Sequence, residues 1–106
     1  MKDNYVRQEE VSRDRYVVVR GNRSGVFAGV FKSRSGTEVV LDNCRRLWYW
    51  DGAASISQIA KQGVSKPENC KFTVPVDGHE ILDAIEVLPM TEVAVTSVMD
   101  VSIWEA

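Results

Sequence analysis

The spacing of apolar residues changes at Asp51-Gly52, and this change constrains the fold more than any other feature of the chain. Before it, short runs of β-branched and aromatic residues alternate with turn-forming residues, which is typical of antiparallel strands joined by tight turns. After it, apolar residues recur at helical spacing until Gly63, a residue that commonly ends helices. The sequence therefore predicts an α+β fold, with a compact and mainly antiparallel sheet of about five strands and two short helices.

The expected strands cover residues 16–20, 26–32, 37–42, 45–50 and 70–76, and a corner at Asp42-Asn43 would separate the third from the fourth. Gly29 is a candidate for a β-bulge or a close backbone approach. The first helix is expected over residues 53–62, and the second begins at Thr91 as its cap and ends near Asp100. Residues 80–88 fit a helix or a strand, and we favour a strand over 84–88.

The length of 106 residues is that of one domain, which we assign to residues 16–106 behind a flexible or edge-lying arm at residues 1–15. No apolar run approaches the roughly 20 residues that span a bilayer, and the charged start of the chain lacks the apolar centre of a signal peptide. We therefore expect a cytoplasmic protein without a membrane partner. Exposed aromatics and a small core also favour a homo-oligomer.

Charge is divided unevenly along the chain, although its formal net value is only −2. Residues 1–46 carry ten Lys or Arg and six Asp or Glu, a net +4, whereas residues 47–106 carry three and nine, a net −6. A basic face of this kind attracts an anion, but the acidic half disfavours binding to long nucleic acids. A small anionic ligand fits the distribution best.

Residues suited to catalysis or metal binding are few. Cys44 and Cys70 have no second cysteine or histidine at a metal-ligand spacing, and the single histidine, His79, has no recognisable nucleophile near it in sequence. The carboxylates between residues 77 and 86 are better explained as a solvated face than as an acid–base pair. The sequence therefore predicts no enzyme, no metal site and no cofactor.

The densest cluster of recognition chemistry is the run Arg-Arg-Leu-Trp-Tyr-Trp at residues 45–50. In a strand, Arg46 would share one face with Trp48 and Trp50, and the other face would carry Arg45, Leu47 and Tyr49. Two interpretations stay open. The tryptophans fill the core beneath solvated arginines, or one face binds a ligand.

Arginine suits phosphate oxygens and indole rings stack on nucleobases, so this cluster holds the minimal groups for binding a nucleotide. A helix start at Ser55 and Ser57 would add unsatisfied backbone N–H groups for an anion. The candidate ligand-binding residues are Asn43, Arg45, Arg46, Trp48, Trp50, Ser55, Lys66 and Lys71. An alternative is a structural or interaction protein whose Arg/Trp cluster is a hot spot for a protein partner.

Several segments together resemble a family of small tailed-phage and prophage proteins known as a domain of unknown function. The segments are RRLWYW at residues 45–50, GAASISQIA at 52–60, GVSKP at 63–67, CKF at 70–72 and AIEVLP at 84–89. The resemblance covers about residues 16–100 and leaves out the arm before them.

Phage proteins of similar size and composition include the Thoeris anti-defence proteins, oligomers that sequester cyclic ADP-ribose isomers and, in some cases, cyclic oligonucleotides of bacterial immunity. This resemblance implies a non-catalytic protein of the host cell cytoplasm that sequesters a small nucleotide signal. It agrees with the residue chemistry, because sequestration requires tight binding and no catalytic group.

Overall fold

A computed structural model describes residues 15–106 of the chain, so the arm expected at residues 1–15 lies outside it except for Arg15. The carbonyl of Arg15 accepts a hydrogen bond of 3.1 Å from the Phe31 backbone N–H, and its guanidinium lies 4.5 Å from the centre of the Phe31 ring. Arg15 therefore packs on the sheet as part of the domain.

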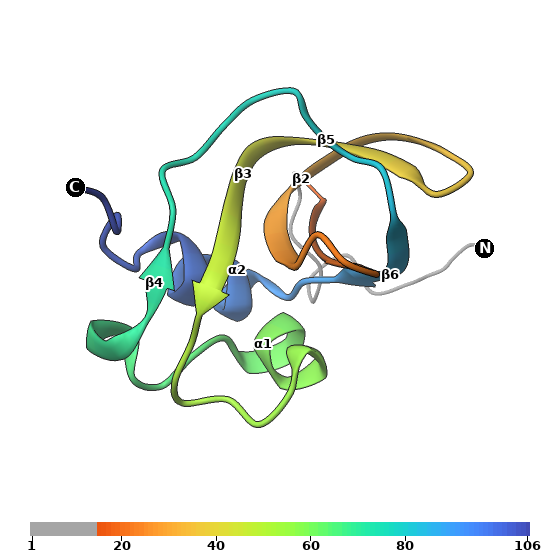
Figure 1. Ribbon diagram of the computed structural model, residues 1–106. Coiled ribbons are helices and arrows are strands. Elements are labelled where there is room, and N and C mark those ends of the chain that lie inside the picture. Colours follow the sequence, from red (N-terminus) through yellow and green to blue (C-terminus); the bar gives the residue numbers. More distant parts are fainter. Residues whose placement is uncertain (1–14) are drawn as a thin grey trace.

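The fold is α+β, as expected, and it consists of one antiparallel sheet of six strands, where about five were predicted, and two α-helices (Figure 1). The strands are β1 (Tyr16–Gly21), β2 (Val26–Ser35), β3 (Glu38–Tyr49), β4 (Lys71–Phe72), β5 (His79–Ile81) and β6 (Ala84–Pro89). Their order is β4-β3-β2-β1-β6, and β5 pairs with β3. Only Leu82 and Asp83 separate β5 from β6, so this bent segment joins β3 to β1 and closes the curled sheet upon itself.

β3 is one long strand, and the corner expected at Asp42-Asn43 is wrong. Asn43 adopts a left-handed conformation with φ 50°, and the pairing of β2 with β3 shifts register opposite it, between Ala28 and Val30. A Cβ atom on Gly29 would lie 2.8 Å from the Asp42 carbonyl oxygen and 2.9 Å from the Cys44 Cα. The close backbone approach expected at Gly29 is confirmed, whereas the bulge lies opposite it, in β3, which it bends without ending.

Both faces of the sheet are buried, which explains the continuous apolar run Val17-Val18-Val19 in β1. Val17 and Val19 point into an inner core within the curled sheet, together with Phe27, Leu41 and Ile81. Val18 points the other way, into an outer core that lies between the sheet and both helices. The domain therefore has two small cores separated by one layer of sheet.

The helices are α1 (Ile56–Gln62) and α2 (Glu92–Met99), and a 3-10 turn, η2, covers Pro67–Asn69. Thr91 caps α2 and Gly63 ends α1 as expected, but α1 begins three residues later than predicted because Ser55 serves as its cap. Among residues 15–106, no helix is long and apolar enough to cross a membrane.

The strand expected over residues 70–76 is reduced to Lys71–Phe72. Pro75 has no N–H to donate, and Val76 keeps only an isolated bridge to Cys44. Ile103 in the C-terminal tail forms a parallel bridge with Phe72, and the Trp104 N–H donates to the Phe72 carbonyl at 2.9 Å. Residues 84–88 form a strand, as we favoured.

Candidate functional site

Arg45 is a buried structural residue whose side chain has no N–H group left for a ligand. Its side chain is 1% exposed, and its Nε donates to the Thr73 carbonyl at 2.8 Å. Arginine carries five N–H donors. The two Nη atoms bond the carbonyls of Phe72, Val98, Met99 and Ser102 at 3.0–3.4 Å. Burial lowers the pKa of Arg45. Arg45 therefore links β4 to the end of α2 through hydrogen bonds, and we do not assign it the ligand-binding role that the sequence suggested.

Arg46 points to the opposite side of β3 and is half-buried. Its Nη1 donates to the Ser24 carbonyl, and its guanidinium carbon lies 4.6 Å from the centre of the Phe27 ring. Within residues 15–106, this is the one hydrogen bond that the guanidinium makes. Most of its N–H donors therefore have no partner in the described part of the chain, in contrast to those of Arg45.

Two surface hollows meet at Arg46. The first, of about 390 Å³, is lined by Arg46, Phe27 and His79 together with the Arg23–Ser24 turn and residues 80–83. The second, of about 430 Å³, runs from Arg46 past Gly25 to Trp48. Small-molecule sites usually measure roughly 300 to 1,000 Å³, so each hollow suffices for part of a small ligand.

Trp48 is the most exposed aromatic residue near Arg46, with 58% of its surface accessible. Its indole stacks on that of Trp104, with ring centres 5.0 Å apart and planes inclined by 25°. The Lys71 Nζ lies 5.3 Å from the Trp48 ring centre and 5.7 Å from that of Trp104. The structure therefore brings Trp48 and Lys71 together, and it adds Trp104, which the sequence reasoning missed because the tail pairs with β4 only in the tertiary structure.

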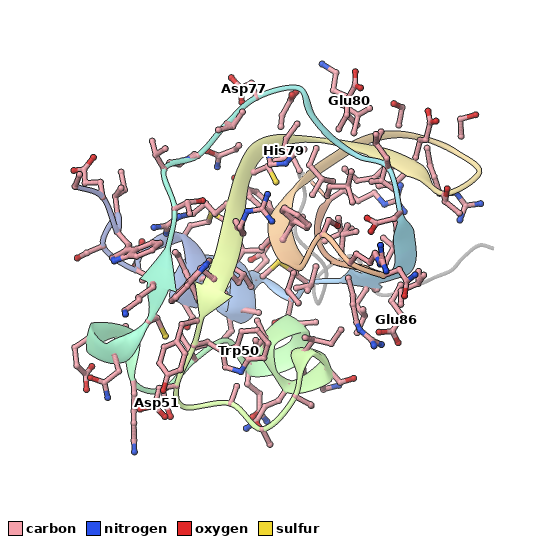
Figure 2. All side chains as sticks on the ribbon, in the orientation of Figure 1. Trp50, Asp51, Asp77, His79, Glu80 and Glu86 are labelled. Atoms are coloured by element: carbon pink, nitrogen blue, oxygen red, sulfur yellow. The ribbon has the colours of Figure 1, made fainter. Side chains whose placement is uncertain are left out.

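Trp50 and Ser55 lie away from this surface. Figure 2 shows Trp50 at the end of β3 beside α1, where the ring packs half-buried against the outer core. The Ser55 hydroxyl accepts the Gln58 N–H at 3.2 Å, and the Gln58 side chain accepts the Ala54 N–H at 2.7 Å. Side chains of the helix start thus cap α1, and we do not propose the anion site that the sequence suggested there.

Lys66 and Asn43 also have other surroundings. Lys66 lies near Asp51, whose pKa is lowered first by a hydrogen bond from Asn69 and then by the Lys66 charge. The Asn43 amide donates to the Tyr16 hydroxyl at 2.9 Å. Of the eight candidate residues, only Arg46, Trp48 and Lys71 remain on one surface.

His79 is a second residue that the sequence reasoning did not assign to the site. Its ring meets the Phe27 ring edge-on at 5.1 Å, at the bend of β3 (Figure 2). Burial, and secondarily the charge of Arg46, lower its pKa. No local motif signals this position, because it depends on the non-local pairing of β5 with β3.

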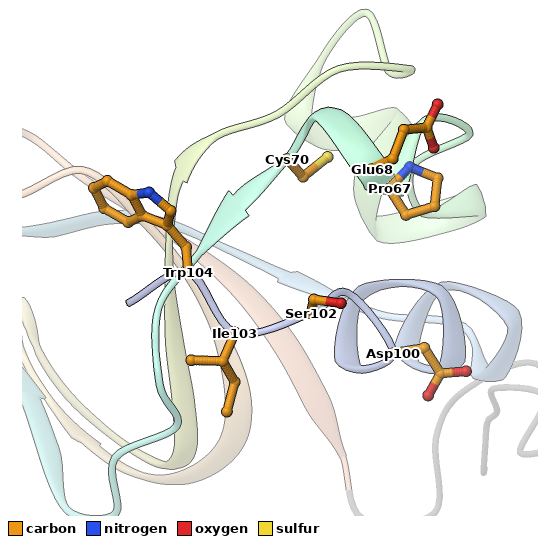
Figure 3. Close-up of a pocket in the computed structure, with 7 residues that line it drawn as sticks. All are labelled: Pro67, Glu68, Cys70, Asp100, Ser102, Ile103 and Trp104. Atoms are coloured by element: carbon orange, nitrogen blue, oxygen red, sulfur yellow. The ribbon is translucent and has the colours of Figure 1, made fainter. Parts of the chain in front are cut away.

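A third hollow, of about 560 Å³, lies at the C-terminal tail (Figure 3). Its wall includes Glu68, Cys70, Asp100 and Trp104. The two carboxylates make it unfavourable for an anion. Cys70 and the buried Cys44 are both free thiols, and among the described residues no group of three or more His, Cys, Asp or Glu side chains is arranged to hold a metal ion.

A family model matches residues 14–98, about four fifths of the chain, and describes them as a domain of unknown function, DUF6948. The chain belongs to this family. No curated protein and no solved structure matches it. The family description assigns DUF6948 no activity, ligand or source, so functional conclusions for this member rest on its own geometry.

Proposed function

We propose that this DUF6948 protein binds a small nucleotide on the face of β3 that carries Arg46 and Trp48. The observation that carries the proposal is the guanidinium of Arg46, which keeps unpartnered N–H groups within the described chain and lies two residues from an exposed indole. Two residues along a strand span roughly 7 Å, so one ligand can contact both side chains. The guanidinium would bind a phosphate oxygen, and Trp48 would stack on the base.

Lys71 supports the same assignment, because its ammonium group lies over the two stacked indoles and adds positive charge beside Trp48. The neighbouring Asp83 is not available for proton transfer. Its carboxylate accepts the Ser24 hydroxyl at 2.5 Å and the backbone N–H groups of Arg23 and Ser24 at 2.8 and 3.1 Å. These contacts favour binding without turnover.

The resemblance to phage proteins leads us to propose the role of this binding. A cyclic ADP-ribose isomer or a cyclic oligonucleotide would be sequestered in the host cell cytoplasm, and the bacterial defence that depends on it would be countered. Such molecules combine flat rings with phosphate groups, which are the two features that Trp48 and Arg46 suit.

Calorimetric titration with cyclic ADP-ribose isomers and cyclic dinucleotides tests the proposal. Arg46→Gln or Trp48→Ala should weaken binding roughly tenfold to a hundredfold, because each removes one contact of about 1 to 3 kcal/mol. Arg34→Gln is the matched control, since Arg34 is exposed in the β2–β3 hairpin and lines neither hollow beside Arg46. The ligand should be recovered unchanged after heat denaturation. Absence of heat with every ligand, or a chemically altered product, would refute the proposal.

We also propose that the protein is a homo-oligomer. Trp48, Tyr49 and Trp104 are 58, 50 and 43% exposed, and adjoining aromatic surface of this kind is often covered by another subunit. Light scattering at micromolar concentration should give a mass of at least two chains. A mass of one chain would contradict oligomerisation and would weaken the sequestration role, because the anti-defence proteins that suggest this role are oligomers.

The same exposed aromatics favour one alternative, an interaction protein that docks on a host protein or belongs to a phage particle. Large aromatic side chains and arginine are the usual anchors of protein interfaces. In this case no nucleotide would raise the melting temperature, whereas Trp48→Ala would abolish binding to the protein partner. The calorimetric result therefore separates the two functions.

A further inference from the structure

The hollow between β3 and β5 contains an imidazole and a guanidinium that share one space. His79 and Arg46 both line it, and the Arg46 charge is close enough to influence the pKa of the imidazole. Among residues 15–106, neither ring nitrogen of His79 has a hydrogen-bond partner, and the guanidinium makes only its bond to Ser24. An imidazole and a guanidinium, both with N–H groups that no acceptor in the described chain satisfies, therefore line one hollow of about 390 Å³.

The charged groups around His79 determine what this hollow accepts. Arg46 approaches from β3 and Arg23 from the β1–β2 turn, whereas Glu80 follows His79 on its own strand and is exposed. Asp83, on the β5–β6 turn, faces the same hollow, but its two oxygens accept hydrogen bonds from Arg23 and Ser24. The Arg46 guanidinium thus has no carboxylate partner in the described chain, and an external anion would meet its N–H donors.

We propose that the Arg46–His79 hollow is an oxyanion subsite, which receives the phosphate group of the ligand, and that His79 takes up a proton as this group binds. This inference rests on the proposed function only for the identity of the whole ligand. Trp48 then lies on the other side of Arg46, in the second hollow, where the ring of the ligand stacks. The ligand would cross Arg46 from one hollow to the other.

Proton uptake follows from the electrostatics of the empty and occupied states. In the free protein, burial and the Arg46 charge lower the pKa of His79 below its usual value, so the imidazole is neutral at pH 7. A bound oxyanion neutralises Arg46 and attracts the imidazolium, which raises the pKa of His79. Proton uptake and anion binding are therefore linked. The affinity for the anion rises as pH falls through the His79 pKa of the bound protein, and it levels off below the His79 pKa of the free protein.

Sulfate is a suitable probe, because its charge is constant over roughly pH 5 to 8, the range in which histidine titrates. His79 is the only histidine of the chain, so one set of imidazole signals in an NMR spectrum reports its protonation. We expect sulfate to raise the His79 pKa by about one pH unit relative to sodium chloride at equal ionic strength. An unchanged pKa would overturn the subsite.

Four variants make the test specific. Arg46→Gln should abolish the rise of the His79 pKa that sulfate causes, and Arg46→Lys should reduce it. Arg34→Gln should leave it unchanged. His79→Gln should make sulfate affinity independent of pH over the same range. If sulfate shifts the His79 pKa equally in the Arg46→Gln protein, whose fold circular dichroism checks, the effect does not depend on Arg46 and the subsite is refuted.

Trp48→Ala separates this inference from the proposed function. The variant should retain the effect of sulfate on the His79 pKa and bind nucleotide more weakly, because the ring and the anion bind on different sides of Arg46. Sulfate binding without any nucleotide binding would support the subsite and contradict the proposed function. Nucleotide binding without a change in the His79 pKa would support the proposed function and contradict the subsite.

Discussion

Arg45 and Arg46 are consecutive residues whose guanidinium groups lie on opposite sides of β3. They differ in how many of their N–H groups are hydrogen-bonded. The Arg45 group donates to backbone carbonyls from β4 to the end of α2, whereas the Arg46 group covers the Phe27 ring and makes one hydrogen bond within residues 15–106. One residue therefore holds the C-terminal part of the domain in place, and its neighbour keeps N–H groups without a partner in the described chain.

Replacement of Arg45 should destabilise the domain more than replacement of Arg46. Arg45→Met leaves the partly buried carbonyls of Thr73, Met99 and Ser102 without their donor. Each unsatisfied group costs about 1 to 3 kcal/mol, so the free energy of unfolding should fall by roughly 3 kcal/mol or more. Arg46→Gln removes one hydrogen bond and one cation–π contact, a loss of about 1 to 2 kcal/mol. Urea denaturation followed by circular dichroism measures both. Equal losses would contradict the structural role of Arg45.

Gly29→Ala should disturb the bulge in β3 that lies opposite Gly29. The new methyl group would meet the Asp42 carbonyl and the Cys44 Cα, which are backbone atoms that cannot rotate away, so we expect a loss of about 1 to 3 kcal/mol. Gly36→Asn is the control. Gly36 has φ 60° and open space around it, and asparagine adopts this conformation more readily than most residues. A control that lost as much stability as Gly29→Ala would remove the steric explanation.

Asp83 should make the domain sensitive to acid. Hydrogen bonds from the Ser24 hydroxyl and from the Arg23 and Ser24 backbone lower its folded-state pKa below 3.8. The contribution of Asp83 to the free energy of unfolding is complete above the unfolded-state pKa of about 3.9. It is lost as pH falls through the lower folded-state pKa. Asp83→Asn should therefore be less stable than the original at pH 7, and the difference should shrink on acidification. A difference independent of pH down to full acid unfolding would exclude this role for the carboxylate.

The two thiols should differ in reactivity. Burial raises the pKa of Cys44 to about 12, with a small opposing effect of Arg46, whereas Cys70 is half-exposed at the third hollow. Iodoacetamide at pH 8 should modify Cys70 first and leave Cys44 unmodified, as mass spectrometry of the digested protein would show. Denaturation should make both react. Rapid labelling of Cys44 in the folded protein would mean that the inner core is open to solvent.

Local patterns were enough to predict the elements whose signals lie close together in sequence. The run at residues 16–20, the cap at Thr91 and the end at Gly63 each depend on a few neighbouring residues, and each is confirmed. The corner at Asp42-Asn43 failed for a physical reason. An asparagine in the left-handed conformation can end a strand or form a bulge within it. Which of the two occurs at Asn43 depends on Gly29 of the opposite strand.

The sequence by itself determined the α+β class, the antiparallel pairing and the Arg/Trp cluster, because alternation, turn residues and helix caps act over short distances. The tertiary structure alone decided which arginine is buried. Alternation separates the faces of β3 but cannot say which one α2 and the tail cover. It also brought His79 to Arg46 and Trp104 to Trp48, contacts between segments more than thirty residues apart. Such contacts form only when the curled sheet closes, since the energy that fixes them comes from burial of the two cores.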